Sequence, residues 1–423
     1  MTVTRAWICL LFVPCFCWAE EDLEWPRWRG VGADGRWNPG KVPGDLARQE
    51  PEELWRVKIG GGYGGVTAAE GRAYLMDYSK SPEQERVLCL DMQTGKEVWS
   101  ASWAVTYGKM DYASGPRSSV VIHELDGKPV AYTLGATGVA SCWDAVHGSL
   151  IWQKDTQKEY GAKVPTWGFA ASPFVYKNTV ILHVGAKPGG CLLALDLKSG
   201  AEVWRAGEDP AGYCTPELIS HLGQEKLIAW GPEHIQSFDP DTGKQNWTYP
   251  YKITYGVSIA QPIYVDGRLI VSGYWHGTKA LKLGKSATEV SLDWEQETEI
   301  CGLMSAPLTK DGRVYLLDKN KGLTCFEAAT GKVIWSDNNQ LSPGGRNPQF
   351  SMVWLDESKG TLALLNSDGE LVYAALEVNG AREIARHQII GKTWAHPAFV
   401  GNQIIARSDT EVIMWKLWKI RIN

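Results

Sequence analysis

Five segments of the chain repeat one pattern, and this repeat limits the possible folds more than any other feature. Each segment has an acidic residue, then Thr, Ser or His three positions later, Gly directly after it, and Trp four positions after the Gly. The first four tryptophans are 53, 52 and 43 residues apart, and the 88 residues before the fifth leave room for one degenerate unit around Trp294. The five segments are 91–99, 144–152, 196–204, 239–247 and 327–335.

The pattern has the chemistry of a tight β-hairpin turn. The acid can accept hydrogen bonds from backbone N–H groups of the turn. Gly can take the positive φ that such a turn needs. The Trp buries a large area, and we interpret it as a tryptophan-docking motif between neighbouring units.

A second hairpin, made of two short apolar strands, precedes each of these turns. Two hairpins give four strands per unit, over a mean period of about 46 residues. Four-stranded units at this spacing predict the blades of a β-propeller. The eight hairpins lie at 66–76, 119–134, 173–184, 216–230, 262–271, 307–317, 351–365 and 397–406.

The predicted fold is therefore all-β, an eight-bladed β-propeller of four-stranded antiparallel blades. The last unit has only three strands, the third at 410–417. A spare strand at 53–59 carries Trp55, which lies 44 residues before Trp99 and so keeps the period. We expect the ring to close by pairing of the N- and C-terminal strands, so that residues 53–423 form one domain. Length alone would suggest about three domains.

The N-terminus has the features of a secretory signal. Arg5 precedes 13 uncharged residues, and Ala19 precedes an acidic stretch. We predict a signal peptide over 1–19, because 13 residues are too few to span a bilayer. Neither Cys15 nor Cys17 has the preceding residues of a lipid-attachment site. The mature chain is expected to be periplasmic or secreted, without a lipid anchor or a transmembrane segment. The net charge of the full chain, −5, argues against a nucleic-acid partner.

Residues 20–52 are rich in Trp, Gly, Pro and charge, and we predict an irregular arm whose three tryptophans dock in surface grooves: Trp25, Trp28 and Trp37. The following segment GGGYGG (60–65) leads into a predicted strand, so it is not a dinucleotide fingerprint. Its glycines are expected to let the chain approach the central channel.

Cysteines recur two residues before the motif acid, where other units have Ala or Ser. We expect these three thiols to be buried: Cys89, Cys142 and Cys325. Cys214 and Cys301 lie outside this register, and a disulfide between them stays open.

The motif A-L-D-x-x-T-G-x-x-x-W resembles the pyrroloquinoline-quinone (PQQ)-like repeat, over five blades and nearly all of the mature chain. Three groups share this resemblance. They are quinoprotein alcohol dehydrogenases that use PQQ with a metal ion, a propeller-type outer-membrane assembly factor, and secreted propellers of unknown role that open with a segment like 24–37. The chain looks most like the third group and then the second. It has no adjacent cysteine pair, no CxxCH motif and few long insertions, unlike many of the dehydrogenases.

Segments with an aromatic residue, a small residue and then Pro precede the first hairpin of several units. The resemblance implies that they line one mouth of the channel. The candidates for an aromatic ring there, which could stack on a flat ligand or sugar, are Tyr107, Trp167, Tyr213, Tyr255 and Trp394. The candidate polar groups are Asp111, Glu299 and His396. The alternative is that these aromatics only fill the channel.

Two functions are compatible with this sequence. The first is an exported, non-catalytic scaffold that binds or assembles an envelope protein or polysaccharide. The second, implied by the resemblance, is a quinoprotein-like dehydrogenase with PQQ and calcium, for which Asp111 or Glu299 could serve as the base. No motif assigns a catalytic or metal-ligating residue. The two functions differ in whether acidic and cationic side chains converge beneath an aromatic face at the channel mouth.

Overall fold

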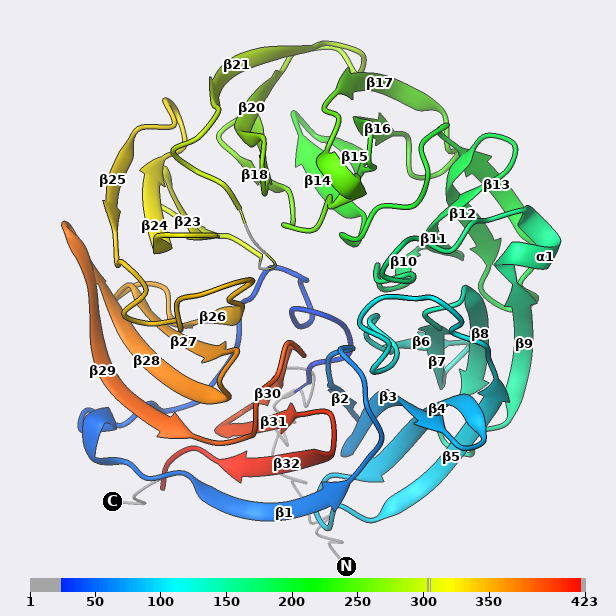
Figure 1. The fold of residues 1–423 in the computed structure, drawn as a ribbon, viewed down its shortest axis with the longest axis horizontal. Coiled ribbons are helices and arrows are strands. Elements are labelled where there is room, and N and C mark those ends of the chain that lie inside the picture. The colour runs from blue at the N-terminus through cyan, green and yellow to red at the C-terminus, as the bar shows by residue number, and fades with distance from the viewer. Residues whose placement is uncertain (1–23, 303, 305, 420–423) are drawn as a thin grey trace, which may run out of the picture.

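A computed structural model describes residues 24–302, 304 and 306–419. In this part of the chain, eight four-stranded antiparallel sheets stand in a ring around a central channel (Figure 1). The predicted eight-bladed propeller is confirmed. The predicted signal peptide, 1–19, lies outside the described residues.

In each blade the strands run from the channel to the outer edge, in chain order for the first seven blades (Figure 1). The first four blades are β2 (Thr67–Ala69), β3 (Arg72–Lys80), β4 (Glu83–Asp91) and β5 (Glu97–Ala104); β6 (Val121–Leu125), β7 (Lys128–Leu134), β8 (Val139–Asp144) and β9 (Leu150–Asp155); β10 (Phe174–Tyr176), β11 (Thr179–Ala186), β12 (Gly190–Asp196) and β13 (Glu202–Ala206); and β14 (Glu217–His221), β15 (Gln224–Trp230), β16 (His234–Phe238) and β17 (Gln245–Pro250).

The other four blades are β18 (Ile263–Val265), β19 (Arg268–Gly273), β20 (Gly277–Leu283) and β21 (Val290–Gln296); β22 (Leu308–Lys310), β23 (Arg313–Asp318), β24 (Gly322–Glu327) and β25 (Val333–Ser336); β26 (Phe350–Asp356), β27 (Thr361–Asn366), β28 (Glu370–Glu377) and β29 (Gly380–Gln388); and β30 (Ala398–Val400), β31 (Gln403–Arg407), β32 (Glu411–Lys416) and β1 (Glu52–Lys58).

Short helical segments occur only in connections of the described chain: η2 (Leu46–Arg48), α1 (Thr156–Tyr160) and η3 (Thr254–Gly256). None of these has the length and apolar character that crossing a bilayer would require.

The ring closes between the two ends of the chain. Strand β1 pairs antiparallel with β32, with Trp55 opposite Met414, and it forms the outer strand of the eighth blade. The predicted closure is confirmed. Arg407, whose side chain is fully buried, donates hydrogen bonds to the carbonyl oxygens of Gly60 at 2.9 Å and Met76 at 2.5 Å. This guanidinium ties the eighth blade to the first.

The repeated turn has the geometry that its residues predict. The Asp91 carboxylate accepts hydrogen bonds from the Thr94 N–H at 2.8 Å and from the Thr94 hydroxyl at 2.6 Å. Gly95 follows with φ of 70°. The same acid-to-turn hydrogen bonds recur at Asp196 and Asp239.

Three of the five motif tryptophans, Trp99, Trp152 and Trp204, lie against the turn glycine of the next blade. The Trp99 ring lies so close to Gly148 that a Cβ atom there would be 2.5 Å from it. The Trp99 indole N–H donates to the Ala145 carbonyl at 2.9 Å. Equivalent glycine contacts join four further pairs: Trp55 with Gly95, Trp152 with Gly200, Trp204 with Gly243, and Trp294 with Gly331.

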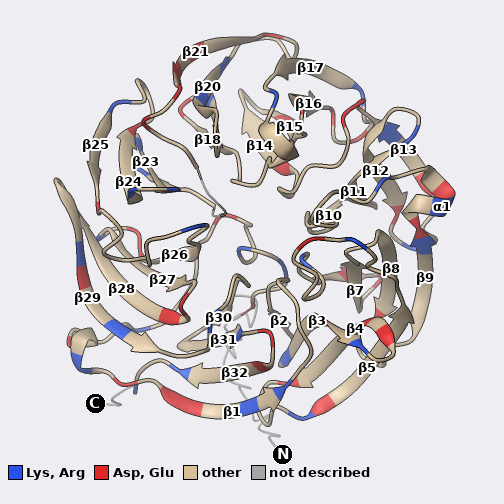
Figure 2. Cartoon of the chain, in the orientation of Figure 1, with Lys and Arg blue, Asp and Glu red and all other residues tan. Residues whose placement is uncertain are grey.

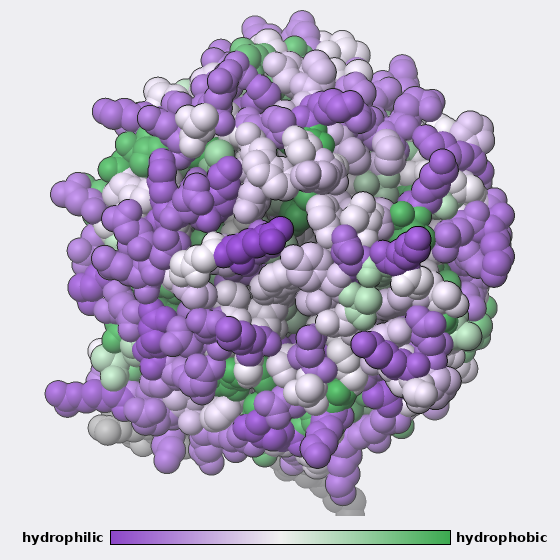
Figure 3. Space-filling view, viewed as in Figure 1, coloured by the Kyte–Doolittle hydropathy of each residue, from purple (hydrophilic) through white to green (hydrophobic). Residues whose placement is uncertain are grey.

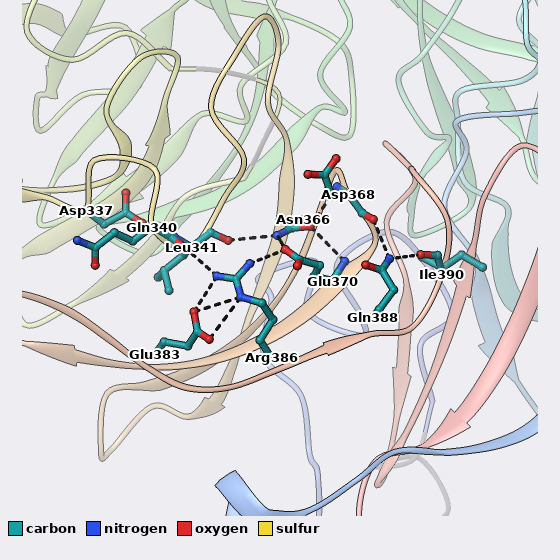
Figure 4. Close-up of polar contacts among 10 residues, drawn as sticks. All are labelled: Asp337, Gln340, Leu341, Asn366, Asp368, Glu370, Glu383, Arg386, Gln388 and Ile390. Atoms are coloured by element: carbon teal, nitrogen blue, oxygen red, sulfur yellow. Dashed lines mark hydrogen bonds and ion pairs between the residues drawn. The ribbon is translucent and has the colours of Figure 1, made fainter.

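The seventh blade lacks the motif turn, and a polar network joins it to the sixth blade (Figure 4). Arg386 on β29 forms ion pairs with Glu383 and Glu370, and it donates to the Gln340 carbonyl at 2.8 Å. Asn366 on β27 donates to Glu370 at 2.8 Å. Trp335 packs in one cluster with residues of the seventh blade, and these charge-assisted hydrogen bonds add to that packing.

The recurring cysteine position lies directly across from the motif tryptophan. Cys89 pairs with Trp99, Cys142 with Trp152 and Cys325 with Trp335, and other blades place Ala194 or Ser237 there. The large indole explains why this position is small. Burial raises the pKa of the Cys89 thiol to about 11. All six described cysteines are buried and free, and Cys214 and Cys301 form no disulfide.

The N-terminal arm crosses the channel (Figure 1, dark blue). Trp25 exchanges two backbone hydrogen bonds with Ala68 on the inner strand β2, and its side chain is only 3% exposed. Farther along, the Gly35 carbonyl accepts a hydrogen bond from the N–H of Trp354 on β26. The arm thus binds the inner strands of the first and the seventh blades. The prediction of surface grooves is wrong for Trp25, because the channel of eight blades leaves space that its indole fills.

Candidate functional site at the channel mouth

A cavity of about 660 Å³ occupies the channel on the face that carries the connections between blades. Figure 3 shows this face, hollowed at the centre of the ring. Charged residues are spread along outer strands such as β1 and β29, whereas the inner strands are mostly uncharged (Figure 2). Eight aromatic side chains line the cavity: Trp28, Tyr63, Tyr112, Trp167, Tyr213, Tyr274, Trp275 and Trp394.

Five of the eight residues predicted for the channel mouth line this cavity: Trp167, Tyr213, Trp394, Asp111 and His396. Trp167 and Tyr213 come from connections that follow successive blades, and their ring centroids are 5.6 Å apart. The repeated position before the inner strand therefore brings these residues together, as expected from the ring.

The other three lie outside the cavity. Tyr107 is 6% exposed, and its hydroxyl donates to the buried Glu85 carboxylate at 2.7 Å, because its connection is long enough to turn back against the first blade. Glu299 is exposed, and only its backbone carbonyl is bonded, by Lys321. Tyr255 is 75% exposed and contacts Trp275 edge-on at 5.6 Å.

Several cavity residues were not predicted. Tyr112 takes the place expected for Tyr107, five residues farther along the same connection. Tyr274 and Trp275 lie in the turn between β19 and β20, outside the segments that precede the first hairpin of each unit. Tyr63 stands among the glycines of 60–65. These glycines, which were expected to approach the channel, are the one sequence feature that could have predicted its position in the cavity.

The aromatic side chains form a wall and a floor. Trp394 lies between Tyr63 and Tyr112, at centroid distances of 5.7 and 5.4 Å. Trp28, from the arm, meets His396 edge-on at 5.5 Å. Trp28, Ser172 and Thr215 also line a second cavity of about 230 Å³, so these three residues lie between the two spaces.

The cavity carries positive charge. Arg117 donates hydrogen bonds to the carbonyl oxygens of Asp111 at 2.9 Å and Tyr112 at 2.6 Å, and its guanidinium lies 5.4 Å from the centre of the Tyr63 ring. Desolvation lowers the pKa of Arg117. Arg346 stands exposed at the rim. Among the described residues, neither arginine forms an ion pair, and the lining includes one carboxylate, Asp111.

His396 is uncharged in this site at neutral pH. Desolvation, together with the positive charge of Arg29, lowers the pKa of His396 to about 3. Its Nδ1 atom lies 2.8 Å from the Ser351 hydroxyl oxygen. His396 is thus held by a hydrogen bond and contributes a neutral ring to the floor.

A row of hydroxyl groups crosses the wall between blades. The Ser119 hydroxyl accepts from the Gly65 N–H at 3.2 Å, the Ser172 hydroxyl from the Ser119 N–H at 3.0 Å, and the Thr215 hydroxyl from the Ser172 N–H at 3.0 Å. Within the described chain, none of these three O–H groups donates to a protein acceptor, so each keeps a donor beside the cavity.

The lining does not fit a calcium-bound quinone. Calcium takes six to eight oxygen ligands, usually with several carboxylates. Among the described residues Asp111 is the one lining carboxylate, and Glu299 lies outside the cavity. No group of three His, Cys, Asp or Glu residues suited to a metal ion occurs in the part of the chain that the structure describes. We therefore derive no step through PQQ.

The chain matches a family model described as outer membrane protein assembly factor BamB, over residues 83–297 and 231–416. It is 22% identical to BamB of Moranella endobia (strain PCIT) over 382 residues, which are 85% of this chain and 88% of that protein. It is 26% identical over 277 residues to quinohemoprotein alcohol dehydrogenase ADH IIB of Pseudomonas putida, which are 61% of this chain and 33% of that protein.

Solved structures agree on the fold. BamB from Moraxella catarrhalis superposes with a TM-score of 0.59 and 16% identity, over 88% of this chain and 99% of that one. Quinohemoprotein alcohol dehydrogenase from Comamonas testosteroni gives a TM-score of 0.65 and 14% identity, over 95% and 82%. At such identities, the likeness establishes the propeller alone.

Proposed function

The chain belongs to the family of the outer membrane protein assembly factor BamB, and from this premise we propose that it is an exported, non-catalytic scaffold that binds protein partners during assembly of the cell envelope. The proposal places the protein in the periplasm, after removal of the segment 1–19. It assigns the docking surface to the rim of the cavity, where Tyr112, Tyr255 and Trp275 stand exposed. We call these three residues the aromatic rim.

One observation carries this assignment. Tyr112 and Tyr255 have φ of 51° and 56°, a left-handed conformation that is strained for a bulky side chain. Both side chains are nevertheless exposed, at 45% and 75%. Strained backbone of this kind collects at functional positions, and exposed aromatic residues are the usual anchors of protein interfaces. Turns elsewhere share the strain and the exposure, but here both coincide with aromatic side chains gathered at the rim of one cavity, and this combination fits a surface kept for a partner.

The experiment replaces both tyrosines by glycine, which takes positive φ without strain. Folding stability should be unchanged or higher in the double variant. Cross-linking of the protein to outer-membrane assembly proteins, and the amount of assembled outer-membrane protein in the cell, should both fall. Glycine thus separates loss of the contact from loss of the fold.

Leu222 offers a matched control on the opposite face. It lies in the turn between β14 and β15, has φ of 51° and is 69% exposed. Leu222→Gly should leave cross-linking and assembly at the level of the unmodified protein. Equal loss in both variants, or no loss in the rim variant, would contradict the proposed docking surface.

A thermal melt with PQQ and calcium distinguishes the quinoprotein alternative from the scaffold function. A ligand present at 100 times its Kd would add about 2.7 kcal/mol to the stability of the folded state. We expect no shift, because the lining offers a calcium ion one carboxylate. A shift that requires both additives would instead support the dehydrogenase.

A further inference from the structure

We propose that the channel-mouth cavity is a binding site for an anionic carbohydrate, a pyranose ring that carries a carboxylate. This goes beyond the scaffold function and does not depend on it. The proposal rests on three features of the cavity: its hydrogen-bond donors, its unpaired cations and its aromatic faces.

The wall presents donors to a ligand. The hydroxyl oxygens of Ser119, Ser172 and Thr215 each accept a backbone N–H from a neighbouring segment. A hydroxyl has one donor besides its acceptor sites, so the three O–H groups remain for a ligand. A ligand rich in acceptor oxygens satisfies them, whereas an apolar ligand would leave them buried without partners.

The two arginines add charge to this donor set. Arg117 is fixed by the carbonyl oxygens of Asp111 and Tyr112, which orient the guanidinium without neutralising it. Arg346 at the rim is exposed. With Asp111 as the lining carboxylate and His396 neutral, the cavity has an excess of one positive charge. Guanidinium groups bind carboxylates through planar, charge-assisted hydrogen bonds.

The aromatic faces select the shape of the ligand. Trp394, Tyr63 and Tyr112 present neighbouring rings on one wall, and Trp167 and Tyr213 on another. Aromatic rings pack against flat apolar faces. A pyranose ring has such a face, and it carries its oxygen atoms around the edge. A volume of about 660 Å³ lies within the range of pockets for ligands of this size. An aromatic acid would meet the rings and one arginine but leave most of the hydroxyl donors unused.

The test is calorimetric titration of the full mature chain with digalacturonate, with the neutral disaccharide galactobiose and with benzoate, at low ionic strength. Digalacturonate should bind at least tenfold more tightly than either comparison ligand. If galactobiose bound as tightly as digalacturonate, the arginines would not contribute to recognition of the carboxylate, and the proposal of an anionic ligand would be wrong. Equal binding of benzoate, or no binding of digalacturonate, would overturn the carbohydrate assignment.

Variants place the ligand in the cavity. Arg346→Gln should weaken digalacturonate binding at least fivefold, and Trp394→Leu at least tenfold. Arg48→Gln, an exposed arginine in η2 that forms no ion pair in the described chain, should leave binding unchanged. Unchanged binding in both cavity variants, with their folding verified by circular dichroism, would overturn the site. The scaffold proposal would stand in that case, because the rim variants test it separately.

Discussion

The outer edge of the ring and the mouth of its channel are built from the same repeating unit but use it in opposite ways. At the edge, Trp99 on Gly148 and Trp152 on Gly200 are near copies of one contact. At the mouth, equivalent connections place Tyr107 against a buried carboxylate, Trp167 in the cavity and Tyr255 in solvent. Positions that stay the same hold the blades together, and positions that vary give the ring one asymmetric site. Substitutions in the two regions should therefore have separable effects.

The largest effect on stability is expected for Trp99→Ala. The variant loses a buried indole, its hydrogen bond to Ala145 and its packing on Gly148. Such truncations cost about 3–5 kcal/mol in the free energy of unfolding, to be measured by urea denaturation. Val98→Ala, at an adjacent side chain that is 44% exposed, should cost under about 0.5 kcal/mol. Equal costs at the two positions would refute the role of the inter-blade contact.

Trp394→Ala tests the channel mouth, the second of the two regions. The Trp394 side chain is half-buried and packs on Tyr63 and Tyr112, so we expect a loss of about 2 kcal/mol in the free energy of unfolding. Binding of an acidic disaccharide should fall at least tenfold. The folded fraction of the Trp99→Ala variant should bind the acidic disaccharide as tightly as the unmodified protein. A loss of binding in both variants would show that the outer edge and the channel mouth are not independent.

Arg386→Ala tests the outer part of the seventh blade, which lacks the repeated turn motif. Loss of the guanidinium leaves Glu370 and Glu383 without their ion pairs, and we expect a cost of about 1–2 kcal/mol that shrinks at high salt. On the same strand, Arg382 pairs with Glu377 in solvent, and Arg382→Ala should cost under about 0.5 kcal/mol. Urea denaturation at two salt concentrations measures both. A salt-independent cost at Arg386 would point to packing instead.

The smallest effect concerns the pH dependence of folding stability, through Glu217 in the second cavity beside the arm. Desolvation raises the pKa of Glu217 to about 6 from 4.5, against the opposing charge of Arg29. The folded protein therefore keeps a proton that the unfolded chain releases, and this stabilisation is complete below pH 4.5 and is lost as pH rises through 6. Glu217→Gln should remove this loss, so that the variant gains about 1 kcal/mol relative to the unmodified protein between pH 4.5 and 7.

Urea midpoints at the two pH values measure this change. Glu124→Gln, at an exposed carboxyl on the inner strand β6, should show no such gain. A gain in both variants would indicate a general effect of charge and would contradict a specific proton on Glu217.

The blades could be predicted because their determinants are local. An acid, a turn residue and a glycine within five positions specify one hairpin, and the eight apolar hairpins that accompany these turns gave the number of blades. The spare strand that carries Trp55 then identified how the ring closes. The buried thiols followed from the same register, because Cys89 occupies a place that other blades fill with Ala or Ser.

The cavity could be predicted only in part, because its residues meet across distances that the repeat does not encode. The repeated segments, read through the resemblance to PQQ-like propellers, predicted which parts of the chain reach the channel mouth, and Trp167, Tyr213 and Trp394 came from that prediction. The lengths of individual connections decided that Tyr112 and not Tyr107 faces the cavity. The position of the arm depends on a space that exists only once eight blades have closed, so the tertiary structure alone placed Trp28 as the floor. Local turn chemistry repeats along the chain, whereas the filling of a shared central space depends on all blades at once.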